Sequence, residues 1–221
     1  MDFSKSLGKC GFCRKTFGKT EMPKHLAECE KGRAGGSKKR FFQLFVEGRR
    51  SPEYWMALAV PASCTLRDLD DYLRKTWLEC CGHLSSFEIN GKKFQSDDET
   101  AGEFGEKTID VALSKVLSPG LTFFHEYDFG STTELKLKVI SDGAGIEGAA
   151  KPVLLARNLP PEISCESCGK KAASVCTACV YRGKGWCCKE CSPKHKCGYE
   201  MALPVVNSPR AGICGYTGKP R

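Results

Sequence analysis

Residues 41–80 read FFQLFVEGRRSPEYWMALAVPASCTLRDLDDYLRKTWLEC. Two runs in this stretch, Phe41–Glu47 and Trp55–Val60, are rich in strand formers, and the segment between them holds the glycine and proline of a turn-like connection. Thr65 is a candidate helix cap. Apolar residues recur after it at helical spacing, which predicts a helix to about Cys80 with one apolar face. The stretch therefore predicts a hairpin followed by a helix.

The chain beyond this helix predicts more short strands. We expect strands at Ser86–Asn90, Lys92–Gln95, Leu121–Tyr127 and Glu134–Ile140, and a short helix at Ile109–Leu117. This order lacks the regular strand-helix alternation of a doubly wound fold. It favours an α+β class with a β-grasp-like mixed sheet and packed helices, plus small modules at both ends of the chain. Another α+β sandwich fits the order nearly as well.

Charge and cysteine are concentrated in the two ends of the chain. The 221 residues contain 15 cysteines and carry a net charge of +8. Residues 1–40 hold 11 Lys and Arg against 4 Asp and Glu, residues 41–150 hold 11 against 18, and residues 151–221 hold 12 against 4. Three cysteines lie in the first of these segments and nine in the last. Two basic, cysteine-bearing ends thus flank an acidic middle.

The cellular compartment bears on what the cysteines do. No stretch reaches the roughly 18 uninterrupted apolar residues of a membrane span, and the first residues contain no apolar run of a signal peptide. We therefore expect a cytoplasmic protein without a membrane partner. In such a compartment many thiols favour metal binding over disulfides.

Glycine-bearing segments suggest the domain boundaries. The predicted parts are a Cys-Cys-His-Cys module at residues 1–31, a basic linker at 32–40, an α+β domain at 41–142, a linker at 143–160, a second cysteine-rich module at 161–200 and an extended tail at 201–221.

The N-terminal cysteines have metal-ligand spacing. Cys10 and Cys13 form a two-residue knuckle, and His25 and Cys29 follow at a helical i, i+4 spacing, so four donors can close a tetrahedron on zinc. The segment resembles a zinc finger of the two-Cys-two-His class with Cys29 in place of the last histidine. That resemblance places Phe17 and Met22 at the two apolar core positions of a ββα finger.

Base reading by this finger is a weaker expectation. The helix positions that contact bases in DNA-reading fingers would carry Gly18, Glu21 and Lys24, and a Gly and a Glu are poor partners for guanine. A zinc-stapled module that binds a protein, or nothing, is favoured over one that contacts phosphates.

The C-terminal end contains three further knuckles. Eight donors lie within 33 residues, enough for two tetrahedral zinc ions: Cys165, Cys168, Cys176, Cys179, Cys188, Cys191, His195 and Cys197. Thiolate-rich sets of this kind favour closed structural sites over catalytic zinc, which keeps a position for water. Counting both ends, two to three zinc ions are expected.

The arrangement resembles cross-brace fingers of the MYND and B-box kind. That resemblance implies one site from the first and third knuckles, and a second from the middle knuckle with His195 and Cys197. Two alternatives stay open. Cys187 can replace Cys188, and Cys214 can replace Cys197, because the gap between His195 and Cys197 is short for this class. A version with a single zinc is also possible.

The acidic middle carries a further pattern. Pro52-Glu53-Tyr54-Trp55, a Trp77…His83-Leu84…Phe87 spacing and Tyr127-Asp128-Phe129-Gly130 occur in order. Over about residues 41–141 the chain resembles the family typified by open reading frame three of an Ri plasmid, which is found beside mobile elements. The resemblance implies an α+β domain of largely uncharacterised role.

The remaining titratable residues of the middle suggest structural roles. Cys64, Cys80 and Cys81 lack a knuckle and are expected as small buried residues. His83 is expected as a hydrogen-bonded structural residue, and Asp128 as a turn-maker rather than a general base.

The sequence therefore predicts a zinc-binding adaptor that is not an enzyme, with no catalytic or organic-cofactor residues and with a protein partner. The alternative is nucleic-acid binding through the basic ends. A rival enzyme hypothesis would need a pocket that joins His83 to Asp128.

Overall fold

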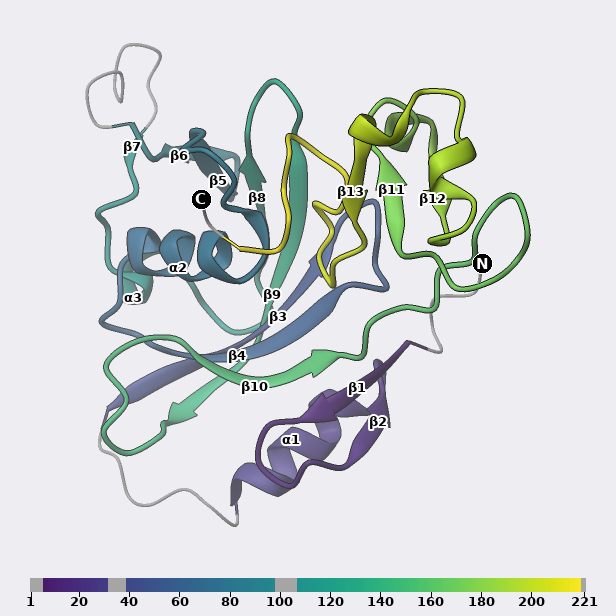
Figure 1. Cartoon of the computed structure of the whole chain (residues 1–221). Coiled ribbons are helices and arrows are strands. Elements are labelled where there is room, and N and C mark those ends of the chain that lie inside the picture. Colours follow the sequence, from purple (N-terminus) through teal and green to yellow (C-terminus); the bar gives the residue numbers. More distant parts are fainter. Residues whose placement is uncertain (1–5, 32–38, 98–106, 220–221) are drawn as a thin grey trace. The chain divides into compact units, whose positions relative to one another are not determined.

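The computed structural model describes residues 6–31, 39–97 and 107–219 (Figure 1). Two compact units account for the chain. The first comprises Met1–Leu73 with Leu84–Leu159, and the second comprises Arg74–His83 with Pro160–Arg221. Each unit is described by itself below.

The first unit is built on a large sheet with few helices. Its strands are β1 (Leu7–Cys10), β2 (Thr16–Gly18), β3 (Arg40–Gly48), β4 (Trp55–Pro61), β5 (Ser85–Ile89), β6 (Lys92–Gln95), β7 (Lys107–Thr108), β8 (Thr122–Tyr127), β9 (Thr133–Ala144) and β10 (Val153–Asn158). Their spatial order is β2-β1-β10-β4-β3-β9-β8-β5-β6-β7. Among the described residues, neighbouring strands are antiparallel except β6 and β7, so the sheet is mixed and is compatible with the expected α+β class.

The strands predicted in the middle of the chain all appear within one or two residues at their starts. The leading hairpin is β3–β4, in which Phe42 pairs with Val60 and Val46 with Met56. The predicted helix from Thr65 is shorter than expected. It runs as α2 over Leu66–Leu73 and continues as a π-helical segment η2 over Arg74–Leu78. Helix α3 spans only Leu113–Val116 of the predicted Ile109–Leu117.

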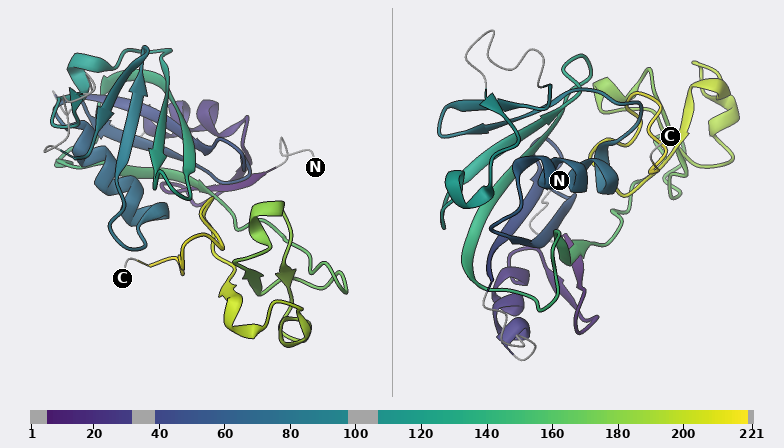
Figure 2. Two further views of the ribbon diagram at one scale, coloured as in Figure 1. Left: turned by 90° about the horizontal axis from the view of Figure 1, so that it is seen from above. Right: turned by 90° about the vertical axis from the view of Figure 1, so that its left-hand side faces the viewer.

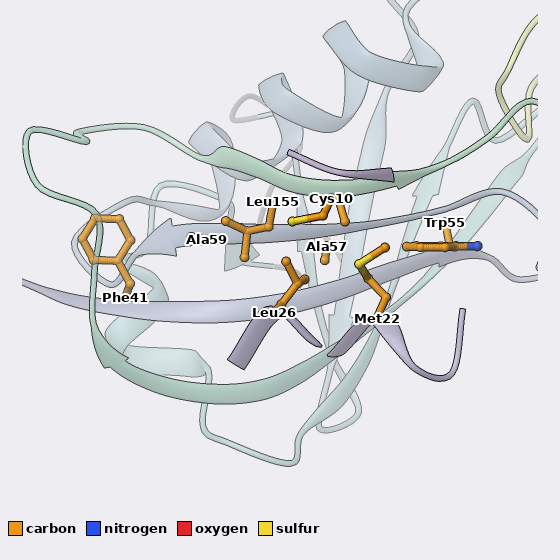
Figure 3. Packing of buried hydrophobic residues seen from close by; sticks show 9 residues of the cluster. Cys10, Met22, Leu26, Phe41, Trp55, Ala57, Ala59 and Leu155 are labelled. Atoms are coloured by element: carbon orange, nitrogen blue, oxygen red, sulfur yellow. The ribbon is translucent and has the colours of Figure 1, made fainter. Parts of the chain in front are cut away.

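Strand β4 is buried on both faces, which explains its continuous apolar run. Trp55, Ala57 and Ala59 alternate with Met56 and Leu58, and the two sets point to opposite sides of the sheet. The first set packs with helix α1 (Met22–Lys31), as Figure 3 shows. Helix α2 lies on the opposite face, so the two helices enclose the sheet between them (Figures 1 and 2).

Helix α2 is joined to its face of the sheet by a buried polar pair. Asp70 of α2 and His125 of β8 are 2.7 Å apart, Oδ1 to Nε2, and both side chains are nearly inaccessible. Such a pair holds the helix in one register, because moving either group away would leave a buried polar atom without its partner.

The N-terminal segment adds its own strands to this sheet. Strand β1 pairs with β10, with Gly8 opposite Asn158, and β10 pairs in turn with β4. Strand β10 lies within residues 143–160, where the glycine content suggested a linker. Its side chains Leu155 and Ala156 are buried, so the hydrophobic surface of β4 explains why this segment is ordered.

The second unit has a smaller sheet. Its three strands, in the order β12-β11-β13, are β11 (Ser174–Cys176), β12 (Trp186–Cys187) and β13 (Ala202–Pro204). Three single-turn 3-10 helices complete it: η3 (Val180–Arg182), η4 (Ser192–Lys194) and η5 (Tyr199–Met201). Segment η2 and the loop that follows it also belong to this unit.

Across both units, no helix of the described residues is long and apolar enough to span a membrane.

Candidate metal centres

The N-terminal cluster forms where a β-turn faces helix α1. Cys10 ends β1 and Cys13 lies in the turn that follows, in which the Arg14 amide donates to the Cys10 carbonyl at 3.0 Å. His25 and Cys29 come from α1, one turn apart. The four donor atoms lie within 4.8 Å of one another, with Cys13 Sγ 3.3 Å from His25 Nε2 and Cys10 Sγ 4.0 Å from Cys29 Sγ.

The apolar residues expected for a finger surround this cluster. Met22 is fully buried, and Phe17 stacks on the His25 ring with centroids 3.8 Å apart. Stacking fixes the ring so that Nε2 faces the Cys13 sulfur.

Two interleaved clusters occupy the second unit. Cys165, Cys168, Cys188 and Cys191 form one group; Cys176, Cys179, His195 and Cys197 form the other. Within each group the four donor atoms lie within 4.8 Å of one another. The first and third knuckles therefore share one group and the middle knuckle completes the other, which is the cross-brace order.

Backbone turns hold each knuckle in shape. The Cys179 amide donates to the Cys176 carbonyl at 3.2 Å, and the Cys191 amide donates to the Cys188 carbonyl at 3.2 Å. A two-residue gap closed in this way brings both sulfurs to one side of the turn. The Gly185 amide also bonds the Glu166 carboxylate at 2.9 Å, which ties the first knuckle to the loop before β12.

The structure places Cys187 and Cys214 outside these two groups. Cys187 lies in β12, opposite Ser174 of β11, and is buried. Cys214 lies in the tail and belongs to a different group of side chains. All twelve residues expected as ligands from the sequence are brought together in the three expected sets, without either substitute.

Because the thiols of a cluster lie close together, the pKa values of neighbouring cysteines are shifted in opposite directions. A backbone hydrogen bond at Cys188 lowers the pKa of Cys165 to about 6, and one at Cys191 lowers the pKa of Cys188. A hydrogen bond with the Cys188 sulfur in turn raises the pKa of Cys191 to about 12, because the Cys191 thiol keeps the proton that it donates.

In the middle knuckle and in the N-terminal cluster, too, some cysteines are held in the protonated form while a neighbour is favoured as a thiolate. The neighbouring Cys197 sulfur raises the pKa of Cys179 to about 11. The Lys15 amide lowers the pKa of Cys13, whereas burial raises the pKa of Cys29 to about 11. A divalent cation shared by all four donors removes this conflict, because it stabilises every thiolate at once.

A fourth cluster was not anticipated from the sequence. Cys80, Cys81, His83 and Cys214 also place their donor atoms within 4.8 Å of one another. The expectation that Cys81 is a small buried residue is wrong, because its side chain is exposed. Cys64 and Cys80 are buried as expected, and Cys64 lies in none of the clusters of the described residues.

The other titratable residues of the middle have structural contacts. Asp128 adopts a positive φ of 65°, and its Oδ1 accepts hydrogen bonds from the amides of Gly130 and Ser131, both at 3.1 Å. This is the turn-making role expected for it. His125 is paired with Asp70 in the core.

The middle of the chain matches a known protein family. The family described as plasmid pRiA4b ORF-3-like protein matches residues 42–171, more than half of the chain. The chain belongs to this family. The matched region runs beyond the resemblance seen at residues 41–141, through β10 and as far as the first C-terminal knuckle.

Comparison with solved structures also gives a match. The protein of unknown function MM3350 from Methanosarcina mazei Go1 is 21% identical over 60% of this chain and 76% of its own length, with a TM-score of 0.48. No protein of curated function matches the chain.

Proposed function

We propose that this plasmid ORF-3-like protein is a non-enzymatic interaction protein whose Cys/His clusters hold structural zinc. The observation that carries the proposal is the closed donor set: each of the three predicted clusters supplies four sulfur or imidazole donors within 4.8 Å. Thiolate and imidazole are the ligands that zinc prefers, and a complete set leaves no position for a catalytic water.

The contacts of the remaining candidate groups support a role without catalysis. Asp128 is used by its own turn, and His125 is held by Asp70. His83 belongs to the fourth cysteine cluster. These contacts give each group a structural role, so we assign none of them to acid-base or nucleophilic chemistry.

The zinc assignment is tested on the purified full-length chain. Elemental analysis should find at least three zinc ions per chain, and X-ray absorption at the zinc edge should show sulfur at about 2.3 Å with nitrogen and no oxygen ligand. Absence of zinc would overturn the proposal. An oxygen in the coordination shell would instead indicate an open, catalytic site.

We further assign the N-terminal cluster to a finger of the two-Cys-two-His kind and the C-terminal pair to a MYND-like or B-box-like cross-brace. The order β1–β2–α1 and the stacking of Phe17 on His25 support the first assignment. The interleaved donor groups support the second. The β-grasp-like plan of the middle is supported by the β3–β4 hairpin followed by α2.

A protein partner, met in the cytoplasm, is the leading candidate, and nucleic acid is the second. The observation that favours nucleic acid is the exposure of Lys171, Lys194 and Lys196 beside the C-terminal clusters. Other basic residues are already paired: Arg40 with Asp142, and Lys170 with Glu190.

Salt dependence separates the two partners. If the exposed lysines contact phosphates, binding to a labelled oligonucleotide should weaken steeply between about 50 and 200 mM salt. A variant with Lys194→Glu and Lys196→Glu should bind more weakly than one with Lys115→Glu, an exposed lysine of the first unit. Absence of oligonucleotide binding at low salt would leave the protein partner as the proposal.

A further inference from the structure

We infer that Cys80, Cys81, His83 and Cys214 form a fourth zinc site, which joins the end of η2 to the C-terminal tail. This site goes beyond the three predicted clusters. Its donors come from two segments of the second unit, and His83 and Cys214 are 131 positions apart in the sequence.

The spacing of the donor atoms fits one tetrahedral ion. Zinc-sulfur bonds of about 2.3 Å place two ligand sulfurs about 3.8 Å apart. In this cluster Cys80 and Cys81 have their sulfurs 3.7 Å apart, and those of Cys81 and Cys214 are 3.9 Å apart. Nε2 of His83 lies 3.1 Å from the Cys81 sulfur and 3.2 Å from the Cys214 sulfur.

The same distances in the two C-terminal clusters are comparable. Sulfur pairs there are separated by 3.5 Å (Cys168 to Cys188) and 3.6 Å (Cys179 to Cys197). The sulfur-imidazole separation is 3.4 Å between Cys179 and His195. By geometry alone, the fourth cluster is as well formed as the others.

The loop after η2 is shaped to present three donors. Glu79 bonds both sides of the turn, since its Oε1 accepts from the Gly82 amide at 2.6 Å and its Oε2 pairs with Arg74 at 2.9 Å. Gly82 has a φ of +82°, a conformation that glycine adopts without strain. The sharp bend brings Cys80, Cys81 and His83 to one side, although no two-residue knuckle is present.

A buried hydrogen bond holds the tail beside this loop. The Ser208 hydroxyl donates to the Trp77 carbonyl at 2.7 Å, and Tyr216 is buried. Cys214 itself has a positive φ of 48°, a conformation that is strained for a residue other than glycine. A ligand bond is a physical reason for holding a cysteine in this conformation.

A buried arginine points independently to a thiolate at this site. Arg210 is fully buried, and its Nη2 lies 3.4 Å from the Cys80 sulfur. Three thiolates around one Zn²⁺ carry a net charge of −1, which the guanidinium offsets. A neutral thiol would offer the buried cation much less stabilisation.

The test counts zinc in the full-length chain and in matched variants. The wild type should hold four zinc ions per chain, and Cys81→Ser should hold three. Cys81→His should restore the fourth, because the exposed position accepts a larger ligand. The control is Cys187→Ala, a cysteine of the same unit outside the clusters, and it should keep four.

A second variant removes the ligand without straining the backbone. Cys214→Gly relieves the positive φ, so a purely structural cysteine should tolerate it. If Cys214 binds zinc, the variant should lose one ion, and trypsin should cleave after Arg210 at least tenfold faster than in Cys187→Ala.

Three outcomes separate this inference from the proposed function. Three zinc ions in the wild type, unchanged in Cys81→Ser and Cys214→Gly, would overturn the fourth site alone. A disulfide between Cys81 and Cys214 in the purified protein would also overturn it. Absence of zinc altogether would overturn the proposed function as well.

Discussion

The N-terminal β1–β2–α1 segment, which we propose as a zinc finger and call the finger, and the C-terminal module of residues 160–204 carry the same kind of Cys/His cluster, but they differ in the apolar surface that accompanies it. In the finger, Met22 and Leu26 are fully buried against Trp55 and Leu155 of the sheet (Figure 3). Burying side chains of this size contributes about 1.5–3 kcal/mol each.

The C-terminal module has no comparable core. Within residues 160–204, which the structure describes in full, the buried hydrophobic residues other than cysteine are Ala172 and Val175. Two small side chains cannot offset the conformational entropy of some forty ordered residues. The comparison teaches that a Cys/His cluster can have two roles. It can add stability to an element that already has a hydrophobic core, or it can supply most of the stability of a module without one.

Removal of zinc should produce the largest difference between the two regions. Structural zinc sites contribute about 10–16 kcal/mol of apparent binding energy each, so a strong chelator should unfold the C-terminal module and leave the main sheet intact. Hydrogen exchange measured by mass spectrometry should show β11 amides losing protection while those of β3, β4 and β9 keep it. Protected β11 amides in metal-free protein would contradict this view.

Loss of one ligand should separate the two regions next most strongly. Cys188→Ser should remove a zinc and most of the protection of β11, because little else holds that strand. Cys13→Ser should also remove a zinc, but the β1–β10 pairing should stay protected, because Met22 and its neighbours remain buried. Hydrogen exchange and zinc content together measure this.

The control for both substitutions is Cys187→Ala. It removes a buried sulfur from the residue adjacent to Cys188 without touching the clusters of the described residues. If it lost zinc to the same extent as Cys188→Ser, the assignment of Cys188 rather than Cys187 to the site would be wrong.

Truncation of an apolar side chain of the finger should have a smaller effect. It should lower stability without loss of zinc. Leu26→Ala should lower the free energy of unfolding of the finger by about 2–5 kcal/mol while its zinc content stays unchanged. Lys24→Ala, an exposed position on the same helix, should change it by less than about 0.5 kcal/mol. Hydrogen exchange of the α1 amides, measured at increasing urea, reports on both variants. Equal effects would show that this face does not stabilise the finger.

The smallest effect is expected at the ion pair between finger and sheet. Lys19 lies 2.5 Å from Glu47, and both side chains are mostly buried. Burial raises the pKa of Glu47, but the hydrogen bond and charge of Lys19 outweigh it and leave the pKa below its usual value. Glu47→Gln should therefore cost about 1 kcal/mol at neutral pH.

The pH dependence gives this last prediction its sign. Because the folded-state pKa of Glu47 is lowered, its contribution is complete above the unfolded value of about 4.3 and is lost as the pH falls through the folded value. The difference in unfolding free energy between wild type and Glu47→Gln should shrink below that pH. The exposed Glu88→Gln should show no comparable difference at any pH.

Much of the fold could be predicted from local sequence patterns, and the errors of the prediction have physical causes. Strands β3 to β6, β8 and β9 were predictable because alternation and turn residues act within a few positions. Strand β10 was missed because glycines on its N-terminal side resemble a linker. Its order comes from pairing with β4, about 95 positions earlier.

The sequence by itself determined the cysteine knuckles, the hairpin-helix plan of the middle and the turn at Asp128. Each depends on neighbours within one knuckle, one helix turn or one β-turn. Only the tertiary structure decided that the finger packs on the sheet and that Cys80, Cys81, His83 and Cys214 meet. Cys80, Cys81 and His83 lack the two-residue gap that marks a metal-binding knuckle in a sequence. The fourth donor, Cys214, is 131 positions away from His83. Only the folding of the tail beside η2 brings them within reach of one ion.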